Sequence, residues 1–142
     1  MQNQMTQFLM PFIKEEKRTL VAGFLGKDMR AASLCAMPQH TVLKAYTDGD
    51  AIERETYQLA VRFPYGVSGT DRDIEQFFYR LAQYVKIHNR EEDFPDLDEN
   101  TLFVSVSCDV PDKIEKVHTD SCVCSAKIHL TYYKMNRKGR NE

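Results

Sequence analysis

The chain has 142 residues, with 19 Lys or Arg against 21 Asp or Glu, which gives a formal charge of -2. This length suits one domain that buries a core without metal or disulfide bonds. The near balance of charge and a pI near 6.1 exclude the basic surface of a dedicated nucleic-acid binder. No apolar run reaches the roughly 18 residues needed to cross a bilayer. Since Met1–Gln4 also lack the cationic flank of a signal peptide, we expect a cytosolic protein without membrane contact.

Charge is unevenly distributed along the chain. Residues 134–142 carry +3, so residues 1–133 carry -5. We therefore expect a single domain over 1–133 and a flexible basic tail over 134–142. A second charged segment contains six acids and no base, namely Glu91, Glu92, Asp93, Asp96, Asp98 and Glu99. This segment is either a solvated connection or a negative field that repels polyanions.

The first half of the chain alternates between helical and extended patterns. An apolar stripe of helical period contains Met1, Met5, Phe8, Leu9, Phe12 and Ile13. It predicts an amphipathic helix, which Pro11 should kink or end near Met10. Three short strands are expected at Thr19–Leu25, Ala31–Met37 and Thr41–Thr47. The Asp48-Gly49 pair then predicts a tight hairpin turn.

The second half supplies one more helix and three alternating strands. Strict alternation over Thr56–Phe63 predicts a strand that buries Tyr57, Leu59, Val61 and Phe63. A helix capped at Thr70 should run to about Asn89 and bury Ile74, Phe77, Phe78, Leu81 and Val85. The last strands are expected to bury Leu102, Val104, Val106, Cys108 and Val110, and then alternate residues of Cys122–Tyr133. The order α-β-β-β-β-α-β-β predicts an α+β fold, a mostly antiparallel sheet with two amphipathic helices packed on it.

Sequence signatures of catalysis and cofactor binding are absent. The six glycines form no phosphate-binding cluster, and no hydrolase or zinc-protease motif occurs. We therefore expect neither an enzyme nor a cofactor. The four histidines are scattered and predict no shared site.

The cysteines leave one alternative open. Cys122 and Cys124 share one strand face, and a hairpin with matched apolar faces would place Cys108 opposite one of them. Adding His118 from the connecting turn completes a set of four zinc ligands. The favoured interpretation is that these thiols are buried and bind no metal, because free cysteine is commonly a core residue.

Four aromatic residues at strand ends form a candidate interface with a partner chain, because aromatic side chains are enriched in interfaces. They are Phe63, Tyr65, Tyr132 and Tyr133.

Three strings of the sequence resemble a phage protein family. They are the hairpin Tyr46–Asp50, the strand Glu55–Arg62 and the helix Asp73–Leu81. Together with the element order, they resemble small minor capsid or tail-completion proteins of tailed phages and prophages of Gram-positive bacteria, which are similar in fold to tail terminators. The resemblance extends from about residue 6 to residue 133.

The resemblance implies a structural virion protein without catalytic residues, assembled in the host bacterial cytoplasm. It implies a homo-oligomeric ring, such as a hexamer, at the head-proximal end of the tail. The implied partners are the tail tube and the head-side connector, with DNA as passing cargo. The acidic segment would then line or rim the channel. The alternatives are another neck or head-completion protein, or a small cytosolic oligomeric adaptor with a cysteine-based metal site.

Overall fold

The computed structural model describes residues 2–23, 25–28, 30–66, 69–111, 116–117 and 120–136. The elements are α1 (Gln2–Glu15), β1 (Thr19–Ala22), β2 (Ala31–Ala45), β3 (Ala51–Pro64), α2 (Thr70–Arg90), β4 (Thr101–Asp109), β5 (Lys116–Val117) and β6 (Ser121–Lys134). The expected α+β class is confirmed, and the predicted elements occur in the expected chain order. Two details differ: the runs at 31–37 and 41–47 are the two halves of the single strand β2, and the short β5 lies between the last two predicted strands. Met1, His118 and the predicted tail beyond residue 136 lie outside the described residues.

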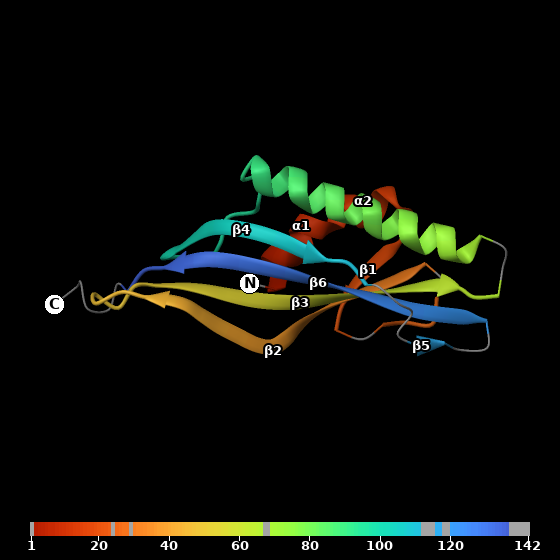
Figure 1. Ribbon diagram of the computed structural model, residues 1–142, viewed down its shortest axis with the longest axis horizontal. Helices are drawn as coiled ribbons and strands as arrows, with labels where there is room; N and C mark the ends of the chain where they lie inside the picture. Colours follow the sequence, from red (N-terminus) through yellow and green to blue (C-terminus); the bar gives the residue numbers. More distant parts are fainter. Residues whose placement is uncertain are drawn as a thin grey trace.

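The strands form one sheet in the order β1-β2-β3-β6-β4, with β5 also paired to β6. Only the β1–β2 pair among these is parallel. Strands β3 and β6 pair along their whole lengths, from Ala51↔Lys134 to Pro64↔Ser121. Both helices cover one face of the sheet, and the end that holds the β2–β3 turn extends beyond them (Figure 1). The helices therefore cover only part of that face, and within the described residues the part near the β2–β3 turn has no helix over it (Figure 1).

Helix α1 packs its predicted apolar stripe against the sheet. The five described members of that stripe are buried: Met5, Phe8, Leu9, Phe12 and Ile13. The helix does not end near Met10 but continues through Pro11 to Glu15. Pro11 lies on the exposed side, where water can satisfy the carbonyl that loses its amide partner.

Aromatic packing and one ion pair join the two helices to each other and to the sheet. Phe12 and Phe63 each contact Phe77 of α2, with ring centroids 5.5 and 5.6 Å apart. Arg80 of α2 makes a two-pronged ion pair with Glu16 at 2.8 and 2.7 Å. The expected core residues of β3 and α2 are buried, with Ile74 partly buried against them.

Strand β4 departs from the expected alternation. Leu102 and Val104 are 55% and 45% exposed, and Val110, just beyond the strand, is 48% exposed. For Leu102 and Val104 a register shift between Phe103 and Ser105 is the cause, because one extra residue reverses which side chains face the core. Val110 is exposed because the pairing of β4 with β6 ends at Asp109. Phe103 packs on the core in place of its two neighbours. The predicted burial of Leu102, Val104 and Val110 is therefore wrong.

The predicted hairpin turn between β2 and β3 is confirmed. Asp48 Oδ1 accepts a hydrogen bond from the Asp50 amide at 3.0 Å, and Gly49 has φ 93°. Asn136 lies against the turn and donates from Nδ2 to the Asp48 carbonyl at 3.2 Å. A side chain at position 49 would meet both an unfavourable backbone conformation and Asn136.

We expect Gly49→Ala to lower the free energy of unfolding by roughly 1–2 kcal/mol or more, because alanine is strained at positive φ. Its Cβ would also clash with Asn136 Nδ2. Urea unfolding measures the effect. Gly26→Ala is the matched control, since a Cβ there has no neighbour within 4 Å. Equal stability of the two variants would contradict the prediction.

Candidate functional site

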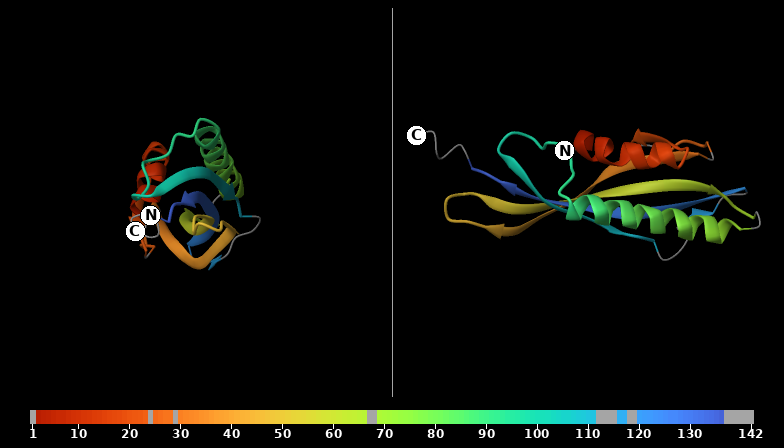
Figure 2. Two further views of the ribbon diagram at one scale, coloured as in Figure 1. Left: turned by 90° about the vertical axis from the view of Figure 1, so that its left-hand side faces the viewer. Right: turned by 90° about the horizontal axis from the view of Figure 1, so that it is seen from above.

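The exposed half of the sheet is the candidate site, and we call it the projecting end. It consists of residues 40–55, 101–105 and 130–136. From this end the strands are seen with β4 and β2 on opposite sides of the central pair β3 and β6 (Figure 2). Two buried polar clusters and two exposed strand edges lie here.

The first buried cluster centres on Asp50, which is 2% exposed. Its carboxylate accepts hydrogen bonds of 2.6 Å from the Tyr133 hydroxyl and from the backbone amide of Asn136. The hydrogen bond to Asp50 raises the pKa of Tyr133 to about 12. These bonds fasten the end of β6 to the β2–β3 turn, so the tip of the projecting end is held by charge-assisted contacts.

The second buried cluster joins two carboxylates to three donors. Glu53 Oε1 receives hydrogen bonds from His40 Nε2 at 2.7 Å and from the Tyr132 hydroxyl at 3.1 Å. Glu55 lies 3.2 Å from the same Tyr132 hydroxyl and accepts a bond of 2.7 Å from the Tyr57 hydroxyl. Glu53 is only 8% exposed, and a carboxylate in such a position requires these donors.

The phenols of this cluster act as fixed donors. Burial, followed by the hydrogen bond to Glu55, raises the pKa of Tyr57. Burial, followed by the nearby charges of Glu55 and Glu53, raises the pKa of Tyr132. Both hydroxyls therefore stay protonated at neutral pH, and the cluster is suited to holding β2, β3 and β6 together.

A hydrogen-bonded chain crosses three strands on the opposite face of the sheet. Asp109 Oδ2 lies 2.8 Å from His129 Nε2, and His129 Nδ1 lies 2.9 Å from Thr56 Oγ1. Sequence analysis did not connect these residues, which only the register of β3, β6 and β4 brings together. Thr56 is 7% exposed, so its hydroxyl is largely withheld from solvent. The chain is suited to fixing strand register.

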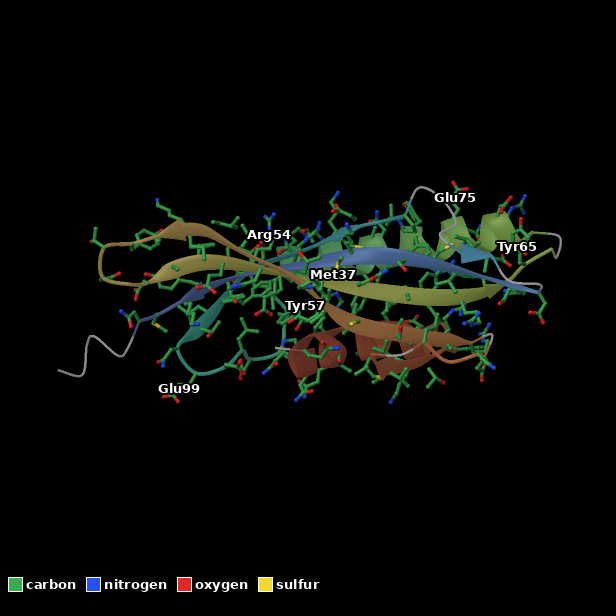
Figure 3. All side chains as sticks on the ribbon, turned by 90° about the horizontal axis from the view of Figure 1, so that it is seen from below. Met37, Arg54, Tyr57, Tyr65, Glu75 and Glu99 are labelled. Atoms are coloured by element: carbon green, nitrogen blue, oxygen red, sulfur yellow. The ribbon has the colours of Figure 1, made fainter. Side chains whose placement is uncertain are left out.

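The acidic segment forms the connection between α2 and β4. All six predicted acids are exposed, whereas Phe94 stacks on Phe103 at 5.1 Å and contacts Phe8 at 4.8 Å. Leu97 also packs on the core. Glu99 lies on the outside of this connection, at the opposite end of the molecule from Tyr65 (Figure 3). The segment is therefore anchored by apolar residues while its negative charge faces outward; its role as a channel rim stays a prediction.

The cysteine site expected from a β4–β6 hairpin is wrong in its geometry. Cys108 pairs with Ile128, not with Cys122 or Cys124, because β5 occupies the Cys122 end of β6. Four residues along β6 separate Ile128 from Cys124, about 13 Å. Across the described ranges, which omit His118, no three metal-binding side chains gather. Burial raises the pKa of the Cys108 thiol to about 12.

Two of the four aromatic residues proposed for the interface are core residues. Phe63 and Tyr132 are 2% and 3% exposed, because strand alternation turns both toward the helix-covered face. Tyr133 is half-buried with its hydroxyl on Asp50. Only Tyr65 is exposed, so this candidate interface is wrong for Phe63 and Tyr132.

The exposed aliphatic side chains of the projecting end lie on its two outer strands. Val42 and Leu43 of β2 are 54% and 45% exposed, and Leu102 and Val104 of β4 are 55% and 45% exposed. Strands β2 and β4 are separated by β3 and β6. Sequence analysis missed these patches, since it assigned Leu102 and Val104 to the core.

Comparison with models of known protein families gave no match, and neither did a search of curated protein sequences. In the described part of the chain, neither helix combines the length and apolar character required to cross a membrane.

We expect Tyr132→Phe to lower the free energy of unfolding at pH 7 by roughly 1–3 kcal/mol, because two carboxylates lose a buried donor. Above about pH 10 the unfolded chain loses phenol protons that the folded chain retains, so stability falls as pH rises. Removing one such phenol should make the stability fall less steeply as pH rises. Urea unfolding at neutral and alkaline pH tests both effects, with the exposed Tyr79→Phe as control. Identical pH profiles for the two variants would contradict the role of Tyr132 as a buried hydrogen-bond donor to Glu53 and Glu55.

Alkylation of the native protein by iodoacetamide near pH 8 should modify Cys35 first. The thiolate is the form that reacts, and Cys35 is the exposed thiol. Cys108 is partly buried and its pKa is raised, while Cys122 and Cys124 are buried. Mass spectrometry should find one adduct on the folded chain and four on the unfolded chain. Equal labelling rates for Cys35 and Cys108 would refute this.

Proposed function

We propose that this chain is a structural protein of the head–tail junction of a tailed phage or prophage. It acts as a tail terminator or tail-completion protein that forms a homo-oligomeric ring at the head-proximal end of the tail. The sequence resemblance motivates the proposal, and the α+β fold agrees with it. Its work is mechanical and not catalytic, and its partners are its own copies, the tail tube and the head-side connector.

The observation that carries the proposal is the pair of exposed aliphatic patches on β2 and β4. They are different surfaces on opposite edges of one sheet. A twofold dimer uses the same patch on both subunits, whereas two different patches on opposite sides suit head-to-tail contacts. Head-to-tail contacts that close by rotation produce a ring.

The charge of the acidic connection supports the same proposal. Its acids are exposed while Phe94 and Leu97 hold it against the core. A negative surface that faces a channel repels DNA and lets it pass without binding. In the proposed ring, Glu91, Glu92 and Asp93 belong to the channel rim.

We expect the purified protein, alone or with phage tail tubes, to form annular particles that cap one end of a tube. Sedimentation gives the mass in solution, and negative-stain electron microscopy shows the particles. A variant with Glu91, Glu92 and Asp93 changed to Lys should still form rings but retain DNA, because the rim would attract phosphates. A chain that stays monomeric at high concentration and binds no tube would refute the proposal.

A further inference from the structure

We infer that neighbouring copies join by strand pairing, with the free edge of β2 in one copy against the free edge of β4 in the next. One antiparallel sheet would then continue from subunit to subunit. The inference rests on the proposed ring and adds the surface, the strand direction and the partner, which is a second copy of this chain.

Each outer strand has a short free segment at the projecting end. On β2, β1 pairs only with Ala31–Leu34, and Thr41–Ala45 is the part of the remaining strand that lies within the projecting end. On β4 it is Thr101–Ser105, since the next amide, that of Val106, donates to Asn89 Oδ1 of α2 at 2.8 Å. Within the described residues, no strand pairs with the outer side of either segment. Free edges of this kind are templates for another strand.

The two free segments lie at the same height on the sheet. Pairing across β3 and β6 connects Ala45 to Thr101 through Ala51 and Lys134. The other end of the same block connects Thr41 to Ser105 through Arg54 and Thr131. Thr41–Ala45 and Thr101–Ser105 therefore lie at corresponding positions on the sheet, and a copy placed alongside without stagger brings them together.

The strand directions also match. Strand β2 is antiparallel to β3, β3 to β6, and β6 to β4, so β2 and β4 run in opposite directions. Adding β4 of the next copy beside β2 continues the antiparallel alternation. The twist of every strand pair gives such an extended sheet a constant turn.

The bulges of the two edges correspond as well. A register shift lies between Val42 and Lys44 on β2, and another between Phe103 and Ser105 on β4. The extra residues, Leu43 and Val104, are both aliphatic and both 45% exposed. A bulge on one edge discourages pairing, but matched bulges give both edges the same local twist. Their side chains supply the apolar contact that backbone pairing alone lacks.

The charges beside the two edges are opposite. On β2 itself Lys44 is exposed, whereas the exposed Asp98 and Glu99 lead into Thr101 on the β4 side. In the unstaggered arrangement Lys44 stands opposite Leu102 of the next copy, three residues from Glu99. Opposite charges favour this pairing over β2 with β2 or β4 with β4.

Two lysine variants test the inference by complementation. Leu43→Lys blocks the β2 edge and Val104→Lys blocks the β4 edge, because a lysine on an edge strand opposes pairing with another strand. Each variant alone should be a monomer by sedimentation. An equimolar mixture should form a dimer with one copy of each, since one intact edge of each kind remains. Ile87→Lys, at a position of α2 that is 40% exposed, is the matched control and should assemble like the parent.

Each outcome separates strand pairing from the proposed function. Circular dichroism and thermal unfolding first establish that the lysine variants fold. If folded variants still form the parent's rings, or if their mixture yields no dimer, strand pairing is overturned while the ring stands. If the parent chain never assembles, both proposals fail. If complementation succeeds but the rings cap no tail tube, strand pairing stands and the phage function fails.

Chemical cross-linking tests the pairing of β2 with β4 of the next copy independently. In a Cys35→Ser background, a chain with Leu43→Cys and a chain with Val104→Cys are mixed and treated with a short bismaleimide. Cross-links should join unlike chains and be absent when either chain is alone. Cross-links between like chains would show a twofold contact and overturn the inference.

Discussion

The full-length pairing of β3 with β6 is the constraint on which the rest of the structure depends. These two strands pair from Ala51↔Lys134 to Pro64↔Ser121; β2, β4 and β5 pair with one of them, and β1 pairs with β2. At one end their common face is apolar and is covered by both helices. At the other end the ribbon continues past the helices (Figure 1). A projecting end with free edges follows from strands longer than the helices can cover.

Buried polar contacts keep that uncovered end ordered where apolar packing is thin. Asp50 bonds the turn to the end of β6, and the Glu53 cluster joins β2 to β3 and β6. Carboxylates surrounded by donors favour one arrangement of the strands, because any slip leaves them unsatisfied. An interface built on strand edges requires such a fixed register.

The acidic connection shows how one segment combines packing with charge. Phe94 and Leu97 contact the core, and the acids between and around them remain in solvent. The same connection leads directly into the free edge of β4 at Thr101. Its first acids follow the end of α2, whereas Asp98 and Glu99 directly precede β4. The small net charge of -2 thus conceals an uneven distribution of charge along the chain.

Local pattern was sufficient to predict the helices, the β2–β3 turn and the buried faces of β3 and β6, because helical and strand periods directly record which side chains face a core. It failed where one residue interrupts the period: Val104 shifts the register of β4, so Phe103 packs partly buried on the core and Leu102 is exposed. The acids of the connection were also evident from sequence, unlike its Phe94 anchor. Strand order decided the rest. Cys108 lies opposite Ile128, Thr56 meets His129, and Thr41–Ala45 lies level with Thr101–Ser105, because hydrogen-bonded pairing between distant segments sets these positions.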